Sequence, residues 1–314
     1  MNRILAVLFI VPIIFVASCN KAERNEIIIF HAGSLSFPFK EIAGEYMDMY
    51  PGIDIKLEGA GSVACARKIT ELNRSCDIMA SADYKVIEKF LMPEYTDWNI
   101  WFATNEMVIA YHEKSAHLDI IGPDNWYEVL SDEDVVYGRS DPDADPCGYR
   151  TVMMFKLAAY YYGQDSLDEA LTAKDRNMIR PKEVDLVALL ETKALDYIVQ
   201  YKSVCEQHGL DYISLPPEIN LSDPNYEDQY NKVSVNIIGD QPGKTIQMKG
   251  STMVYGLTLL NDAPNRDAAV DFLSYFLGER GRSVLQNNGQ SPLNLHLEGP
   301  ASNIPEKLLE FFNM

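Results

Sequence analysis

The sequence predicts an α/β protein with two doubly wound lobes joined by crossing strands. In the first part of the chain, an apolar run of strand length, a loop of small residues and a helical pattern follow one another three times. Strands that alternate with helices in this way form a parallel sheet covered by helices. A second block of this kind begins after residue 111, and the apolar run 253–260 returns the chain to the first block. The length of 314 residues is enough for two domains.

The first block opens with the apolar run Glu26–Phe30, which is typical of a strand buried on both faces of a parallel sheet. Its other expected elements are the helix 38–50, the strand 53–57, the helix 63–72 with Ser62 as its cap, the strand 77–81 and the helix 84–91. Ser34 and Ser62 follow directly after the first two strands. Ligands bind at the carboxyl edge of such sheets, so both serines are candidate ligand contacts.

The second block lies between two crossing strands, which we expect near Ala110 and Tyr255. Its expected elements are the helices 126–130, 149–162, 181–190 and 195–208 and the strands 135–138 and 233–238. The helices 264–277 and 278–287 and an amphipathic tail at 304–312 follow the return. We therefore expect residues 26–110 with 256–314 to form one lobe and residues 111–255 to form the other, with a cleft between them.

The N-terminus has the pattern of a lipoprotein export signal. Residues 4–15 carry no charge and are too few to span a bilayer, which is typical of the apolar core of a signal peptide. The segment ends in Val-Ala-Ser-Cys19, which resembles the bacterial lipobox. We expect residues 1–18 to be removed, Cys19 to carry a lipid anchor and residues 19–25 to be a tether at the periplasmic or extracytoplasmic face of a membrane. An uncleaved anchor and an ordinary export signal are the alternatives.

The charge balance argues against several partners. The formal net charge of −19 disfavours binding to nucleic acid and to anionic membrane surfaces. An anion site must therefore be built from local dipoles, because no positive field surrounds the protein. The four Cys residues after Cys19 fit no metal-binding spacing, and we expect them to be free and mostly buried.

The most informative local pattern is the helix start at Asp145. Asp145 is typical of an N-cap and Pro146 of the first helical residue. The free N–H groups of such a first turn bind oxyanions, so a carboxylate here occupies the place of an anion. Either Asp145 only caps its helix, or the ligand has a central atom that accepts a carboxylate oxygen. Glu218, which follows two prolines, and Tyr230 are further candidates, with a solvated loop residue and a packed side chain as the alternatives.

Other chemical motifs are incomplete. Gly59-Ala-Gly-Ser62 lacks the third glycine of a dinucleotide fingerprint, and Pro146 stands where a calcium loop starting at Asp141 needs glycine. The five His residues lack the spacing of a zinc pair. Ser34 and Ser62 do not lie in a Gly-x-Ser-x-Gly nucleophile elbow.

Six motifs in the same order resemble those of the archaeal-type tungstate/molybdate-binding proteins of ABC importers. They are His31-Ala-Gly-Ser-Leu-Ser36, Glu58-Gly-Ala-Gly-Ser62, Asp77-Ile-Met-Ala-Ser-Ala-Asp-Tyr84, Asp145-Pro-Cys-Gly-Tyr-Arg150, Leu215-Pro-Pro-Glu-Ile-Asn-Leu221 and Gly250-Ser-Thr-Met-Val-Tyr-Gly256. The resemblance covers most of the chain after the export signal. It implies a class II substrate-binding-protein fold that holds a tetrahedral oxyanion between two lobes. The chain departs from the family in its acid-rich lead-in to Asp145 and in its bacterial lipobox.

The resemblance also implies two carboxylates that complete six-coordination of the metal centre in the oxyanion. By motif these fall on Asp145 and Glu218. The implied neutral donors to the oxo groups are Ser34, Ser62, the amides of Cys147 and Gly148, and Tyr230. The implied function is the capture of tungstate or molybdate by a monomeric, lipid-anchored protein, without catalysis or a resident cofactor, for delivery to an ABC permease and its ATPase.

Two alternatives remain. A binding protein for another anion, such as sulfate or a small carboxylate, would leave Asp145 and Glu218 without ligand contact. An exported hydrolase or transferase would need a general base beside Ser34 or Ser62, and the sequence offers no obvious candidate.

Overall fold

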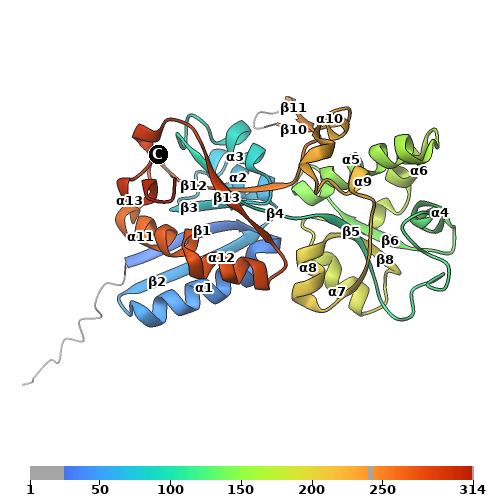
Figure 1. The fold of residues 1–314 in the computed structure, drawn as a ribbon, viewed down its shortest axis with the longest axis horizontal. Coiled ribbons are helices and arrows are strands. Elements are labelled where there is room, and N and C mark those ends of the chain that lie inside the picture. Colours follow the sequence, from blue (N-terminus) through green and yellow to red (C-terminus); the bar gives the residue numbers. More distant parts are fainter. Residues whose placement is uncertain (1–24, 240–242, 313–314) are drawn as a thin grey trace, which may run out of the picture.

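The computed structural model describes residues 25–239 and 243–312, which form two α/β lobes side by side (Figure 1). Lobe 1 contains residues 25–104 and 254–312, and lobe 2 contains the segment 107–253 between them. The two lobes agree with the predicted architecture. The expected export signal, the lipid-anchor residue Cys19 and most of the tether lie outside the described residues.

Lobe 1 is built on a six-stranded sheet with the order β13-β4-β12-β3-β1-β2. Its strands are β1 (Asn25–Ala32), β2 (Ile53–Ala60), β3 (Ile78–Ser81), β4 (Asn99–Thr104), β12 (Val254–Leu259) and β13 (Ser291–Glu298). As predicted, β1 pairs in parallel with β2 and β3, whereas β12 runs antiparallel to β3 and β4. The strands β4 and β13 are not among the predicted elements, although β13 alternates half-buried and exposed residues as an edge strand does.

The helices of lobe 1 pack on both faces of this sheet (Figure 1). They are α1 (Ser36–Met49), α2 (Ser62–Thr70), α3 (Tyr84–Phe90), α11 (Arg266–Leu277), α12 (Glu279–Asn287) and α13 (Glu306–Leu309), with the 3-10 turns η1 (Gly33–Leu35) and η4 (Ala301–Asn303). Phe39 of α1 stacks on Phe276 of α11 with ring centroids 4.7 Å apart, so these two helices share one aromatic core.

Lobe 2 is built on a five-stranded sheet with the order β7-β6-β8-β5-β9. Its strands are β5 (Met107–Tyr111), β6 (Tyr137–Ser140), β7 (Ile179–Arg180), β8 (Tyr197–Tyr201) and β9 (Asp211–Ser214). Its helices are α4 (Trp126–Ser131), α5 (Pro146–Tyr162), α6 (Leu167–Ala173), α7 (Asp185–Glu191), α8 (Lys202–His208), α9 (Pro217–Asn220) and α10 (Glu227–Tyr230), with the 3-10 turns η2 (Arg176–Met178) and η3 (Pro224–Tyr226). An antiparallel pair, β10 (Ser234–Ile238) and β11 (Thr245–Lys249), forms a separate sheet that contacts α5.

The segment 195–208, which the sequence pattern predicts as one helix, is instead a strand followed by a helix. The strand β8 pairs antiparallel with β5 and parallel with β6. Tyr197 and Tyr201 imitate the i, i+4 spacing of a helix, but every residue of β8 is buried. A central strand covered on both faces shows no alternation, so local periodicity could not separate it from a helix.

The chain crosses between the lobes a few residues earlier than expected. The strand β5 pairs with β8 and β9 and therefore belongs to lobe 2. The outgoing crossing consists of Asn105 and Glu106, between β4 and β5, and does not lie near Ala110. The return strand β12 already pairs with β4 from Val254, close to the expected crossing at Tyr255.

Candidate functional site

Asp145 caps the helix α5, as predicted, and it also holds a loop from another part of lobe 2. Its Oδ1 accepts a hydrogen bond of 2.9 Å from the backbone amide of Cys147. Its Oδ2 accepts one of 2.8 Å from the backbone amide of Glu183. The side chain is 1% exposed, and Pro146 is the first residue of the helix. Asp145 therefore brings Glu183 to the start of α5.

Glu183 is the residue that the sequence reasoning missed. It is 1% exposed, and neither carboxylate oxygen has a hydrogen-bond partner of good geometry, although the Asp145 carboxyl and the Ser34 backbone lie close enough to shift its pKa. A Cβ atom added to Gly33 of lobe 1 would lie 2.8 Å from its Oε1, so the carboxylate lies directly against the backbone of that loop. Buried carboxylate oxygens without partners are costly, which makes this group the strongest indication of a ligand site in the described residues.

Burial raises the pKa values of both acids, and the charge of Asp145 adds to the shift of Glu183. Burial raises the pKa of Asp145, although hydrogen bonds from Glu183 and Cys147 oppose the shift. Burial raises the pKa of Glu183 further, and the adjacent Asp145 carboxylate adds to the effect. Two carboxyl groups in one buried site cannot both ionise cheaply without a positive partner. A ligand with an electrophilic centre would supply that partner.

A signal for Glu183 exists in the sequence, but it depends on recognising a very short strand. β7 ends at Arg180 and lies parallel to β6, which ends five residues before Asp145. The carboxyl ends of adjacent parallel strands share one edge of the sheet, so the loops after β6 and β7 meet. Because β7 has only two residues, the segment from Pro181 was predicted as helix and its Glu was not considered.

Ser34 and Ser62 lie where the sequence places them, at the carboxyl ends of β1 and β2, and both are fully buried. The Oγ of Ser34 lies 2.9 Å from the hydroxyl of Tyr255, and the Oγ of Ser62 accepts a hydrogen bond of 2.9 Å from the amide of Ala82. The sequence pattern predicts Ser62 as the N-cap of α2, but Gly61 is the N-cap and Ser62 is the first helical residue. Both hydroxyls retain a proton that they can donate to an oxyanion.

The start of α2 in lobe 1 meets the loop before Asp145 in lobe 2. The amide of Ala64 donates a hydrogen bond of 3.1 Å to the carbonyl of Ala144. A Cβ atom at Gly61 would lie 2.3 Å from the same carbonyl oxygen, so only glycine allows this approach. Ser62 is thereby brought to the same part of the interface between the lobes as Asp145.

The amides of Cys147 and Gly148 lie at the same helix start, but Asp145 engages both of them. Cys147 donates to the Asp145 side chain, and Gly148 donates to its carbonyl oxygen at 2.9 Å. A Cβ atom at Gly148 would lie 2.4 Å from the carbonyl carbon of Asp141, so the loop 141–145 folds tightly onto the first turn. Turning the Asp145 side chain away would free the amide of Cys147, whereas the amide of Gly148 is held by the backbone carbonyl.

Glu218 and Tyr230 are not brought to this cluster. Glu218 is half-buried in α9, and its Oε1 accepts a hydrogen bond of 3.0 Å from the Tyr226 hydroxyl. The hydroxyl of Tyr230 donates to the carbonyl of Pro217 and accepts a bond of 3.3 Å from the amide of Asp223. The Glu218 side chain joins α9 to η3, and the Tyr230 side chain joins α10 to α9. The residues that contact Asp145 and Ser34 are instead Glu183 and Tyr255.

A buried ion pair joins the lobes next to the site. The Oδ2 atom of Asp83 in lobe 1 accepts a hydrogen bond of 2.7 Å from the hydroxyl of Tyr149 in lobe 2. The same Oδ2 atom lies 3.2 Å from Nη2 of Arg150, also in lobe 2. The guanidinium of Arg150 also donates to the carbonyl of Ala82 at 2.7 Å. Because Arg150 is 2% exposed, its charge depends on these contacts across the interface. The structure therefore has its lobes closed over the acid pair.

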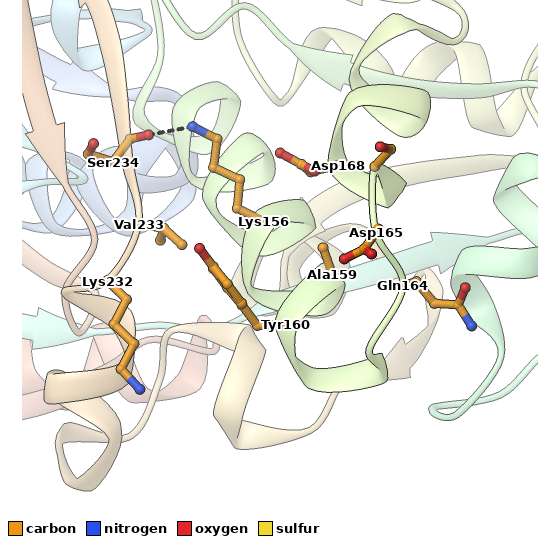
Figure 2. Close-up of a pocket in the computed structure, with 10 residues that line it drawn as sticks. Lys156, Ala159, Tyr160, Gln164, Asp165, Asp168, Lys232, Val233 and Ser234 are labelled. Carbon is orange, nitrogen blue, oxygen red and sulfur yellow. Dashed lines mark hydrogen bonds between the residues drawn. The ribbon is translucent and has the colours of Figure 1, made fainter.

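Other features of the described residues offer no competing site. No group of three or more His, Cys, Asp or Glu residues in the described ranges is arranged to hold a metal ion. The four cysteines after Cys19 are free and buried, as expected. A surface pocket of about 380 Å³ lies between α5, the start of α6 and the segment before β10 (Figure 2). It contains none of the predicted site residues.

The comparisons with known proteins agree with this architecture. Residues 27–290 match the family model described as bacterial extracellular solute-binding protein. An uncharacterised solute-binding protein of Petrotoga mobilis is 47% identical, with 91% of this chain and 90% of that protein covered. The molybdate/tungstate-binding proteins WtpA of Pyrococcus abyssi and Thermococcus kodakarensis are 44% and 43% identical, over 91% and 93% of this chain and 89% and 88% of theirs.

Solved structures show the same fold at low sequence identity. The periplasmic molybdate-binding protein of Azotobacter vinelandii is 15% identical with a TM-score of 0.58, covering 84% of this chain and 98% of that one. The sulfate-binding protein SubI of Mycobacterium tuberculosis is 9% identical with a TM-score of 0.59, covering 92% of both chains. Among the described residues, no helix has the length and apolar character needed to cross a membrane. By its family match and its relatives, this chain belongs to the bacterial extracellular solute-binding proteins.

Proposed function

We propose that this protein binds molybdate or tungstate between its lobes, with Asp145 and Glu183 bonded directly to the central metal atom. The observation that carries the proposal is the buried acid pair, in which both oxygens of Glu183 lack a partner. The names of the relatives at 43% and 44% identity support the same ligands. Glu183 replaces Glu218 as the second carboxylate, because it is the acid whose amide Asp145 holds.

The chemistry of the two acids explains which oxyanions would be accepted. Molybdenum and tungsten are large and electrophilic and can expand from four to six oxygen neighbours. Sulfur in sulfate and phosphorus in phosphate do not do so stably. Two ionised carboxylates would attract the first pair through coordination and would repel sulfate through Coulomb interaction. The same acids therefore provide both affinity and selectivity.

The oxo groups of the ligand would be held by uncharged donors. Ser34 and Ser62 approach from lobe 1 and the first turn of α5 from lobe 2. There the amide of Cys147 becomes a donor once the Asp145 side chain turns to the metal, and the amide of Gly148 would have to share its proton with the Asp145 carbonyl. The dipole of α5, a helix of 17 residues, favours the bound negative charge at its N-terminus. Because donors come from both lobes, ligand binding would favour the closed arrangement.

The wider role that we propose is delivery of the oxyanion to an ABC permease with its ATPase. The family of extracellular solute-binding proteins provides the general setting. Anchoring through Cys19 at the periplasmic or extracytoplasmic face, and action as a monomer, are parts of the proposal that rest on the sequence pattern alone.

Thermal unfolding in the presence of different oxyanions tests the proposal. A ligand at about 1,000 times its Kd stabilises the folded state by roughly 4 kcal/mol. We expect a large rise in Tm with molybdate and tungstate and almost none with sulfate or phosphate. A rise with sulfate as large as that with molybdate would overturn the coordination argument in favour of a general anion-binding protein.

A hydrolase or transferase is disfavoured by the partners of the two serines. The Oγ of Ser34 is bonded to a tyrosine hydroxyl and the Oγ of Ser62 to a backbone amide. His31, the nearest histidine in sequence to Ser34, has its Nδ1 engaged by the carbonyl of Ala32 at 2.8 Å. Neither hydroxyl is therefore paired with a general base.

A further inference from the structure

A chain of hydrogen bonds runs from the outgoing crossing segment to Ser34. Asn105, which lies between β4 and β5, donates through Nδ2 to the hydroxyl of Tyr255 at 2.8 Å and to the Oγ of Ser203 at 2.6 Å. The Tyr255 hydroxyl in turn lies 2.9 Å from the Oγ of Ser34. Tyr255 is in β12, and Ser203 is in the first turn of α8 in lobe 2. The chain of bonds thus joins both crossing strands to the ligand site.

The direction of these bonds is fixed by the surroundings of Asn105. Its Oδ1 accepts hydrogen bonds from the backbone amides of Glu106 at 2.9 Å and Ser203 at 3.3 Å. A flipped side-chain amide would place its NH₂ group against these two N–H donors, which excludes that orientation. The Nδ2 group therefore faces Tyr255, and it can only donate.

The donor at Asn105 sets the roles of the next two hydroxyls. The Tyr255 oxygen accepts from Asn105, so its own proton is directed to the Oγ of Ser34. Tyr255 is fully buried, and burial raises the pKa of its hydroxyl to about 12, so the proton remains in place at neutral pH. Ser34 then accepts from Tyr255, and its own proton is free for a further acceptor.

The carbonyl of Ser34 is held just as firmly. It accepts hydrogen bonds from Nε2 of Gln290 at 2.9 Å and from Nε2 of Gln207 at 3.1 Å. Gln290 belongs to lobe 1 and Gln207 to α8 of lobe 2. With the backbone fixed on one side and the hydroxyl fixed on the other, Ser34 has little freedom to change the direction of its remaining proton.

We propose that Asn105 and Tyr255 are positioning residues that make Ser34 an obligate hydrogen-bond donor to the ligand, so that this part of the site accepts only an unprotonated oxygen. The proposal rests on the proposed function, since it concerns the same bound oxyanion. It assigns the crossing segment a role in recognition as well as in connecting the lobes. A fully deprotonated oxyanion such as molybdate accepts the hydrogen bond from Ser34. A protonated ligand oxygen at the same place would direct its own proton at the proton of the Ser34 hydroxyl, which is repulsive.

The substitution Asn105→Asp tests the direction of the bonds. The carboxylate is nearly isosteric but can only accept, so Tyr255 would donate to it and Ser34 would donate to Tyr255. Ser34 would then present a lone pair to the ligand. Hydrogen bonds to charged groups contribute roughly 1.5–3 kcal/mol, so we expect molybdate affinity in calorimetric titration to fall about 10- to 100-fold.

The substitution Asn105→Asp also adds a negative charge, and combining it with Ser34→Ala or with Tyr255→Phe separates the effect of the charge from that of the reversed hydrogen bonds. In Ser34→Ala and in Tyr255→Phe the reversal has no route to the ligand, whereas the charge remains. We expect the loss caused by Asn105→Asp to be about tenfold smaller in either background than in the wild type. Equal losses in all three backgrounds would overturn the proposal and leave only charge repulsion.

A double-mutant cycle of Tyr255→Phe and Ser34→Ala tests the same proposal without the variant Asn105→Asp. Tyr255→Phe alone should weaken molybdate binding several-fold, and this effect should disappear when Ser34 is already Ala. Additive losses would overturn the proposal. A wild-type protein that binds neither molybdate nor tungstate would overturn the proposed function together with it, whereas binding with additive losses overturns the positioning role alone.

Discussion

The two lobes contribute different chemical groups to the proposed site, hydroxyls from lobe 1 and carboxyl groups from lobe 2. Lobe 1 contributes the hydroxyls of Ser34 and Ser62, which are uncharged and already have a partner each. Lobe 2 contributes Asp145 and Glu183, whose pKa values are both raised by burial, that of Glu183 also by the charge of Asp145. Buried hydroxyls with a partner cost little, whereas buried carboxylates without one cost much. We infer that the acids of lobe 2 provide the selectivity for the ligand, and that the hydroxyls of lobe 1 hold its oxygen atoms in place.

The largest expected effect is that of Glu183→Gln. The amide cannot bond to the metal as a carboxylate does, so we expect molybdate affinity to fall roughly 100-fold or more. The ligand-free protein should become more stable, because the repulsion between the two acids is removed. Calorimetric titration and thermal unfolding measure the two effects.

Glu218→Gln is the matched control for that substitution. It makes the same chemical change at the acid that was favoured by the sequence motif but lies beside Tyr226. We expect less than a twofold change in affinity. Equal losses of molybdate affinity in the two variants would show that Glu218 matters for binding as much as Glu183, and would contradict the assignment of Glu183 alone.

The second prediction concerns a titratable group in lobe 1 that is kept neutral. Burial lowers the pKa of His31 from 6.5 to about 4. Below pH 6.5 the His31 imidazole is therefore protonated in the unfolded chain, whereas in the folded protein it becomes protonated only near pH 4. This difference should cost up to about 3 kcal/mol of stability as the pH falls between these values. Urea unfolding of wild type and His31→Gln at pH 7 and pH 4.5 measures it.

The acids of lobe 2 should act in the opposite direction. The folded-state pKa of Glu183 is raised, so acid relieves a penalty that is fully present only at higher pH. We expect His31→Gln to lose less stability in acid than the wild type, and Glu183→Gln to lose more. A His31→Gln variant with the wild-type pH profile would show that this imidazole is not the neutral buried group described here.

The smallest expected effect comes from the ion pair between the lobes. Asp83→Asn removes the counter-charge of the buried Arg150, which would favour the open arrangement and lower molybdate affinity about tenfold. Glu45→Gln, which breaks a half-exposed contact of Arg280 within lobe 1, is the control and should leave affinity unchanged. Small-angle scattering of the ligand-free variants should show Asp83→Asn to be the more extended one.

The sequence predicts the lobes well because their signals are local. The three strand–helix repeats of lobe 1 and the cap and proline at the start of α5 are all present as expected. Ser34, Ser62 and Asp145 lie where the same reasoning places them in the fold, at strand ends or a helix start. These positions follow from topology and capping rules that need no knowledge of packing.

The pairing of distant residues could not be read from local patterns. Glu183 reaches Asp145 only because β7, a strand of two residues, lies next to β6. Tyr255 reaches Ser34 only because the return strand β12 joins the sheet of lobe 1. Glu218 had the stronger local signal, a rigid proline-flanked loop, but rigidity does not determine which residue the loop faces.

X-ray absorption spectroscopy of the tungstate-bound protein tests the central claim most directly. Direct coordination by Asp145 and Glu183 predicts six oxygen neighbours around tungsten in the wild type and fewer in Glu183→Gln. A spectrum with only the four oxygens of free tungstate in the wild type, unchanged by the substitution, would contradict the account.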